Sequence, residues 1–124
     1  EIQRILKPQG RCIITMPFMY PLHDAPLDFQ RLTKYGLEKM MTNQGLIVKN
    51  ITQRGKPLET AALLFNIAMT KTVMNWVKYK HPASILALLL PINIFLINIS
   101  TWFFSQLSQE DDLMPYGYHV ILEK

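Results

Sequence analysis

The chain has 124 residues, of which 49% are hydrophobic and 18% are charged, and its formal net charge is +4. This length is enough for one small domain with a hydrophobic core, and the composition excludes a disordered chain. Nucleic-acid binding is not expected, because the basic residues form no run and do not alternate with aromatic residues. A single cysteine, Cys12, excludes an internal disulfide framework, and three isolated histidines give no metal-site spacing.

The first half of the chain is predicted to alternate between helix and strand. Residues 1–7 form the end of an amphipathic helix that Pro8 and Gly10 terminate. Its apolar side consists of Ile2, Ile5 and Leu6. Residues 11–16 are a short apolar run, typical of a strand buried on both faces of a parallel sheet.

A loop over residues 16–30 leads into a second helix. Thr33 is its predicted N-cap, and Gly45 is its predicted C′ residue. Leu32 and Leu37 take the two positions of a hydrophobic staple. The buried stripe of this helix is predicted to be Leu37, Met40 and Met41.

Strand patterns at residues 46–53 and 116–124 enclose an insertion of about sixty residues. The closing strand places Tyr118, Val120 and Leu122 on one face. The insertion begins with a predicted helix at residues 60–80 and continues with an uncharged stretch. The chain therefore divides into an α/β part at 1–56, a hydrophobic helical insertion at 57–113 and a closing strand at 114–124.

Four segments follow a family pattern. They are EIQRILKPQG at 1–10, PFMYPLHDAPLDFQRLT at 17–33, GLIV at 45–48 and YGYHVILEK at 116–124. They resemble, in order, four parts of class I S-adenosylmethionine-dependent methyltransferases (type 11-like). These parts are the E-x-x-R-v-L-K-P-G-G segment, the P-f-x-y-P-x-H-x-x-P-x-D-f-x-R-y-T loop, the start of the sixth strand and the closing seventh strand. Gln9 replaces a glycine of the pattern, and Leu32 replaces a commoner aromatic residue.

The resemblance implies a Rossmann-like α/β fold, of which this chain carries strands five to seven with an antiparallel closing strand. It also implies S-adenosylmethionine as cofactor and an unknown methyl acceptor, and the loop pattern belongs to a subgroup often associated with cell-envelope genes. The family binds its cofactor on a Gly-rich loop, whereas the five glycines here are scattered singly. We therefore expect the chain, which starts on Glu1, to be an inactive fragment whose cofactor site lies mostly in a missing N-terminal half.

The loop after residues 11–16 leaves the carboxyl end of a predicted strand, where ligands bind in open α/β sheets. His23 is the candidate catalytic base, because histidine exchanges protons near neutral pH. The alternative is that His23 only hydrogen-bonds the loop. Asp28 and Arg31 are candidates to bind an anionic acceptor, with Asp28 orienting Arg31, or else they brace the loop.

Two aromatic residues of the same loop, Phe18 and Tyr20, are candidates to line the acceptor pocket. The alternative is that they pack the loop against the sheet. No metal ligand and no cofactor-binding residue is assigned.

The uncharged stretch at 81–109 contains 22 residues, 83–104, that are long enough to span a bilayer. If the last two strands pair, both ends of the insertion lie on one side of a membrane, which excludes a single crossing. Three alternatives remain open for this hairpin, expected to bend at Pro91: contact with a membrane surface, a soluble lid or dimer face, and a true span.

Two functions of different classes follow. The first is methyl transfer to a cell-envelope or lipid-linked acceptor by a cytoplasmic enzyme, peripheral on the inner face of the membrane. The second is a non-catalytic membrane- or partner-binding module that keeps half of the fold. In isolation, the chain is expected to dimerise or aggregate through its open sheet edge.

Overall fold

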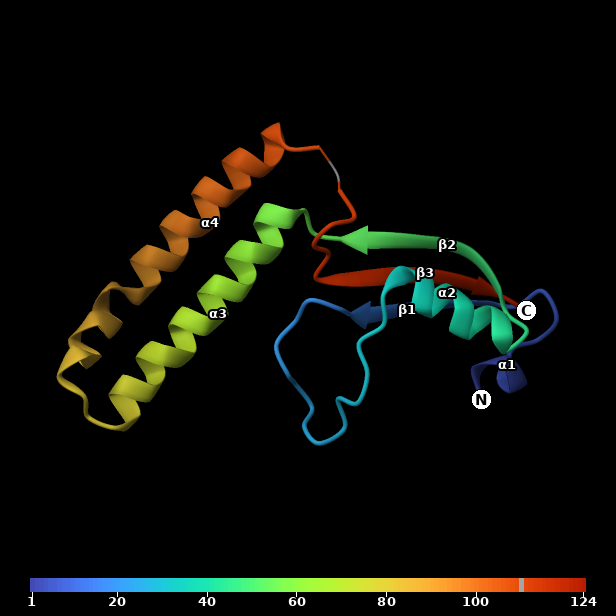
Figure 1. Ribbon diagram of the computed structural model, residues 1–124, viewed down its shortest axis with the longest axis horizontal. Helices are drawn as coiled ribbons and strands as arrows, with labels where there is room; N and C mark the ends of the chain where they lie inside the picture. Colours follow the sequence, from blue (N-terminus) through green and yellow to red (C-terminus); the bar gives the residue numbers. More distant parts are fainter. Residues whose placement is uncertain (110) are drawn as a thin grey trace. The chain divides into compact units, whose positions relative to one another are not determined.

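The computed structural model describes residues 1–109 and 111–124, and it contains two compact units (Figure 1). The sheet unit comprises Glu1–Gly55 and Pro115–Lys124, and the helical unit comprises Lys56–Met114. These limits differ by one residue from those expected from the sequence.

The sheet unit combines three strands with two helices, so the mixed helix-and-strand class is confirmed. Its elements are α1 (Ile2–Ile5), β1 (Arg11–Pro17), α2 (Lys34–Asn43), β2 (Ile47–Arg54) and β3 (Gly117–Glu123). The strand order is β1-β3-β2, and β3 is antiparallel to both neighbours, so β1 and β2 run in the same direction. The closing strand is therefore antiparallel, as expected, and it pairs with β2.

The hydrophobic core lies between one face of this sheet and the two helices. Its buried residues are Leu37, Met41, Leu46, Tyr118, Val120 and Leu122. The last three come from alternate positions of β3, which confirms their predicted common face. Met40 was predicted in the same stripe but is 36% exposed, because it lies at the edge of the helix face that meets the sheet.

The expectation that β1 is buried on both faces is wrong for this structure. Exposed and half-buried residues alternate along β1, and Ile13 is 63% exposed. The reason is that the core lies on one face of the sheet only. On the other face, Glu123 pairs with Lys49 at 3.0 Å and with Arg11 at 3.3 Å, and these cations lower the pKa of the Glu123 carboxyl.

Local signals set the ends of α2 as predicted. The Thr33 hydroxyl accepts a hydrogen bond from the Gly36 amide at 3.2 Å, which satisfies one free N–H of the first turn. Gly45, directly after the C-cap, has a φ of 73°, a conformation that glycine adopts without strain.

The first helix is shorter than predicted, since α1 ends at Ile5. Ile5 is 63% exposed and does not share the buried side of Ile2 and Leu6. In the following turn Gln9 carries the positive φ of 59°. Gly10 is needed for another reason, because a Cβ there would lie 2.7 Å from the Lys7 carbonyl oxygen.

The helical unit is an antiparallel hairpin (Figure 1). Its elements are α3 (Pro57–Lys78), the 3₁₀ helix η1 (Pro82–Leu89) and α4 (Leu90–Leu107). Helix α3 begins three residues before its predicted start. Pro57 is well suited to a first helical turn, and the Glu59 carboxylate accepts a hydrogen bond from the Lys56 amide. The chain reverses before Pro82, so the bend predicted at Pro91 is wrong: Pro91 lies in the first turn of α4, where its missing N–H costs no hydrogen bond.

Small and polar side chains occupy the seam between α3 and α4. Ala62, Val73 and Ser105 are buried there, and the Asn66 amide donates to the Asn98 side chain at 2.9 Å. Beside this seam, the Lys56 ammonium donates to the carbonyl oxygens of Ser105, at 2.7 Å, and Ser108, at 3.1 Å. Hydrogen bonds therefore join α3 to α4 both along the helices and at the N-terminal end of α3.

Candidate acceptor site

The loop that follows β1 is attached to the start of β3. The Phe18 amide donates to the Tyr116 carbonyl at 2.8 Å, which continues the β1–β3 ladder for one residue. The Phe18 ring then packs against Tyr118, with ring centroids 5.6 Å apart. Phe18 thus contributes to the core, in agreement with the packing alternative for this residue.

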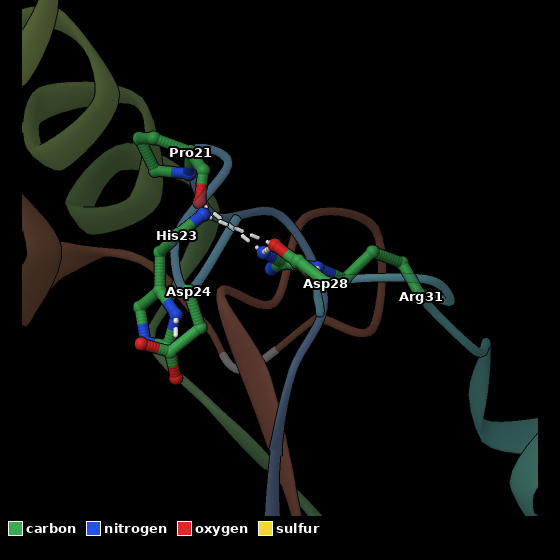
Figure 2. Close-up of polar contacts among 5 residues, drawn as sticks. All are labelled: Pro21, His23, Asp24, Asp28 and Arg31. Carbon is green, nitrogen blue, oxygen red and sulfur yellow. Dashed lines mark hydrogen bonds and ion pairs between the residues drawn. The ribbon is translucent and has the colours of Figure 1, made fainter. Parts of the chain in front are cut away.

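Asp28 is the centre of the loop (Figure 2). Its carboxylate accepts hydrogen bonds from the His23 amide at 3.1 Å, from Arg31 Nε at 2.9 Å and from Arg31 Nη2. Arg31 Nη2 also donates to the Pro21 carbonyl oxygen at 3.2 Å. One ion pair therefore holds four positions of the loop together.

The same contacts fix the charge of Asp28. The hydrogen bonds from Arg31, and then that from the His23 amide, lower the pKa of Asp28 from 3.8 to about 2. The Arg31 guanidinium faces this carboxylate with its Nε and Nη2 atoms, so this edge of its fork is occupied, and its Nη1 atom is buried. This geometry favours the bracing alternative for the pair over direct binding of an anion.

The His23 side chain lies at the surface beside this brace. Its Nδ1 atom is 3.4 Å from an Asp24 carboxylate oxygen, and its ring meets Tyr20 edge to face at 6.0 Å. Figure 2 shows the imidazole and Asp24 together, away from the Asp28–Arg31 pair. The imidazole is about half exposed and is accessible to a second molecule.

His23 borders a hollow of about 230 Å³ at the end of the sheet. The hollow is lined by Thr15, Met16, Pro17, Tyr20, His23, Arg54, Tyr116 and Gly117. These residues come from the carboxyl ends of β1 and β2, from the loop after β1, and from the start of β3 with the residue before it. A smaller hollow of about 190 Å³ lies beside it, bordered by Tyr20, Asp28 and Arg31 among others.

Two residues of the larger hollow, Arg54 and Tyr116, were missed in the sequence. The Arg54 guanidinium lies 5.7 Å from the centre of the Tyr116 ring, and the Tyr116 amide donates to the Arg54 carbonyl at 3.0 Å. The sequence signal that could have revealed them is that β1 and β2 run in the same direction, which brings their carboxyl ends to one edge of the sheet. To identify Arg54 and Tyr116 from this signal, one also needs the strand order, in which β3 lies between β1 and β2.

The described residues do not fit a cofactor cradle for S-adenosylmethionine. Such a cradle needs backbone that a ligand can approach closely. A Cβ on Gly10 or Gly117 would instead lie 2.7 Å from a carbonyl oxygen of the chain itself. Nor do any three His, Cys, Asp or Glu side chains within residues 1–109 and 111–124 gather closely enough to hold a metal ion.

Comparison with known proteins gives no match: no family model, no curated protein and no solved structure is significantly similar to this chain.

Proposed function

We propose that the sheet unit is the acceptor side of a class I S-adenosylmethionine-dependent methyltransferase, as the C-terminal part of its Rossmann-like sheet. The observation that carries this proposal is the Asp28 brace. It braces the loop that follows β1 from within, and His23 of this loop shares one hollow with Arg54 at the carboxyl ends of β1 and β2. Such strand ends are where open α/β sheets bind their ligands.

The roles of the residues follow from their positions. S-adenosylmethionine, for which the described residues form no cradle, would supply the methyl group and would leave as S-adenosylhomocysteine. His23 removes the proton from a hydroxyl or amine acceptor, since its ring is accessible at the rim. Arg54 binds an anionic group of the acceptor, because its planar guanidinium is exposed at the same hollow. Asp28 and Arg31 keep the loop in place.

The acceptor and the setting are proposed from the resemblance. The loop pattern favours a cell-envelope or lipid-linked acceptor, methylated by a cytoplasmic enzyme that works on the inner face of the membrane. Because the cationic Arg54 borders the hollow, we also expect the acceptor to carry an anionic group.

The test is methyl transfer by a protein extended N-terminally in the same reading frame. It is incubated with S-adenosylmethionine labelled on its methyl group and with a cell-envelope fraction, and the label transferred is counted. We expect His23→Ala to lower the rate by more than about tenfold while cofactor affinity is unchanged. His81→Ala, which removes a histidine of the helical unit, is the matched control. A His23→Ala rate near that of the parent protein would contradict the proposed role of His23.

A second candidate function is a non-catalytic membrane-binding module. The observation that favours it is the 26-residue apolar segment Pro82–Leu107, whose most apolar 18-residue window has a mean hydropathy of 2.1 and contains no buried residue. By length and composition alone, this segment could cross a bilayer. A protein that binds vesicles and, with its upstream extension, binds no S-adenosylmethionine would favour the module over the enzyme.

A further inference from the structure

The outer side of α4 carries a continuous apolar stripe. Its residues are Ile92 (57% exposed), Phe95 (60%), Leu96 (56%), Ile99 (50%), Trp102 (65%) and Phe103 (57%). They recur at intervals of three and four residues, so they share one face of the helix. Six large apolar side chains in one patch mark a surface that another body covers.

The side of α4 that faces α3 carries different side chains from this stripe. Asn98 and Ser105 face α3, where they form hydrogen bonds or are buried, and Ile97 and Thr101 on this side are half-buried. The side of α4 that faces α3 thus carries both polar and aliphatic side chains, whereas the bulkiest apolar side chains of the helix lie on its exposed face. In water the reverse arrangement is favoured, because burying the apolar side chains removes them from solvent.

The distribution of charge indicates which body covers this stripe. Residues 81–109 contain no Asp, Glu, Lys or Arg, whereas Lys71, Lys78 and Lys80 lie on α3 and at the hairpin turn. Asp111 and Asp112 follow at the opposite end of α4. An uncharged stripe with lysines near one end fits an apolar layer bordered by anionic headgroups.

The sheet pairing restricts how the hairpin can meet a bilayer. Arg54 at the end of β2 is the register partner of Gly117 at the start of β3. Both ends of the hairpin are therefore tied together, and a single crossing is excluded. A double crossing would carry Lys78 and Lys80 through the hydrocarbon layer, which is costly and against the preference for cytoplasmic lysines.

We propose that α4 lies in the plane of an anionic lipid bilayer, with the Ile92–Phe103 stripe inserted at the boundary between headgroups and acyl chains. Trp102 then lies at the depth that tryptophan prefers, and the lysines of α3 and the turn contact the headgroups. This inference does not depend on the proposed methyl transfer.

The first test is flotation of the 124-residue chain with vesicles of phosphatidylcholine and phosphatidylglycerol in equal parts. We expect it to float with these vesicles, and to float less with phosphatidylcholine alone or at high salt. Ile99→Glu places a charge in the stripe and is expected to lower partitioning by about tenfold or more. Asn75→Glu adds the same charge at an exposed position of α3 and is the control. Equal loss in both variants, or no flotation of the parent chain, would overturn the proposal.

The second test reads the depth of each tryptophan, since the chain contains only Trp76 and Trp102. The variant Trp76→Phe keeps only Trp102, in α4, and the variant Trp102→Phe keeps only Trp76, in α3. In vesicles with brominated acyl chains, we expect strong quenching of Trp102 by bromines near the headgroups and weaker quenching of Trp76. Quenching of Trp76 as strong as that of Trp102 would overturn the in-plane orientation, because only a double crossing carries both helices into the bilayer.

A second copy of the chain is the other occupant that the tests distinguish. If sedimentation shows a dimer that Ile99→Glu dissociates, and the chain does not float with anionic vesicles, the stripe is a protein interface and the proposal fails.

Discussion

The Asp28 carboxylate accepts hydrogen bonds from His23 and Arg31, and so joins three positions of the loop after β1. Because both partners favour the ionised form, the pKa of Asp28 is lowered from 3.8 to about 2. A lowered folded-state pKa stabilises the loop at every pH above the ordinary value. That contribution is lost as the pH falls from about 4 through about 2.

This dependence gives a prediction at the level of one residue. The amide resonance of His23, followed by NMR, is expected to shift with a midpoint near pH 2, when the carboxylate that it binds becomes protonated. In Asp28→Asn this transition is expected to disappear, whereas in Asp24→Asn it should persist. A midpoint near the ordinary pKa of 3.8 in the parent chain would show that the brace is absent in solution.

The residues of the candidate site could be predicted only in part from the sequence. Asp28 and Arg31 are three positions apart, so their pairing is a local property, and the sequence already offered it as an alternative. Arg54 and Tyr116 are separated by the whole hairpin. They share a hollow only because β3 pairs with β2, and no local pattern carries that information.

The helices and strands also differ in how far their features could be predicted from the sequence. The cap at Thr33 and the left-handed residue at Gly45 follow from the chemistry of neighbouring residues, and both are confirmed. The position of the hairpin bend is wrong, because a proline is compatible both with a turn and with a first helical turn. The burial of β1 depends on what covers the second face of the sheet, which its own apolar run does not encode.

At the level of elements, the cap of α2 gives a stability prediction. Thr33→Ala removes the hydroxyl that accepts the Gly36 amide, and we expect it to lower the free energy of unfolding by about 1 kcal/mol. Thr42→Ala, at an exposed position within the same helix, is expected to change it by less than about 0.5 kcal/mol. Urea denaturation of the three proteins measures both values, and equal effects would argue against a capping role for Thr33.

Across the whole molecule, the two units have opposite surfaces. The sheet unit encloses its own core between the helices and one sheet face, whereas the helical unit exposes most of its large apolar side chains. The six residues of the buried cluster described above all belong to the sheet unit, whereas the helical unit buries only Ala62 and Val73 among its described apolar residues. We therefore expect the sheet unit to fold without the hairpin.

Replacing residues 57–113 by a short Gly/Ser linker tests this independence. The Tyr116 amide already donates to the Arg54 carbonyl at 3.0 Å, so β2 and β3 can be joined as an ordinary strand pair. The shortened protein is expected to unfold in one cooperative transition by circular dichroism, and to lose binding to anionic vesicles. Loss of cooperative unfolding would mean that the hairpin is part of the folding unit.

The central claim, that this chain is the acceptor side of a methyltransferase, is tested most directly by calorimetric titration of S-adenosylmethionine. The ligand is titrated into the 124-residue chain and into a protein extended N-terminally in the same reading frame. We expect binding by the extended protein and none by the 124-residue chain, because the glycines of this chain form no cradle. Absence of binding by both would contradict the methyltransferase proposal and favour the membrane-binding module.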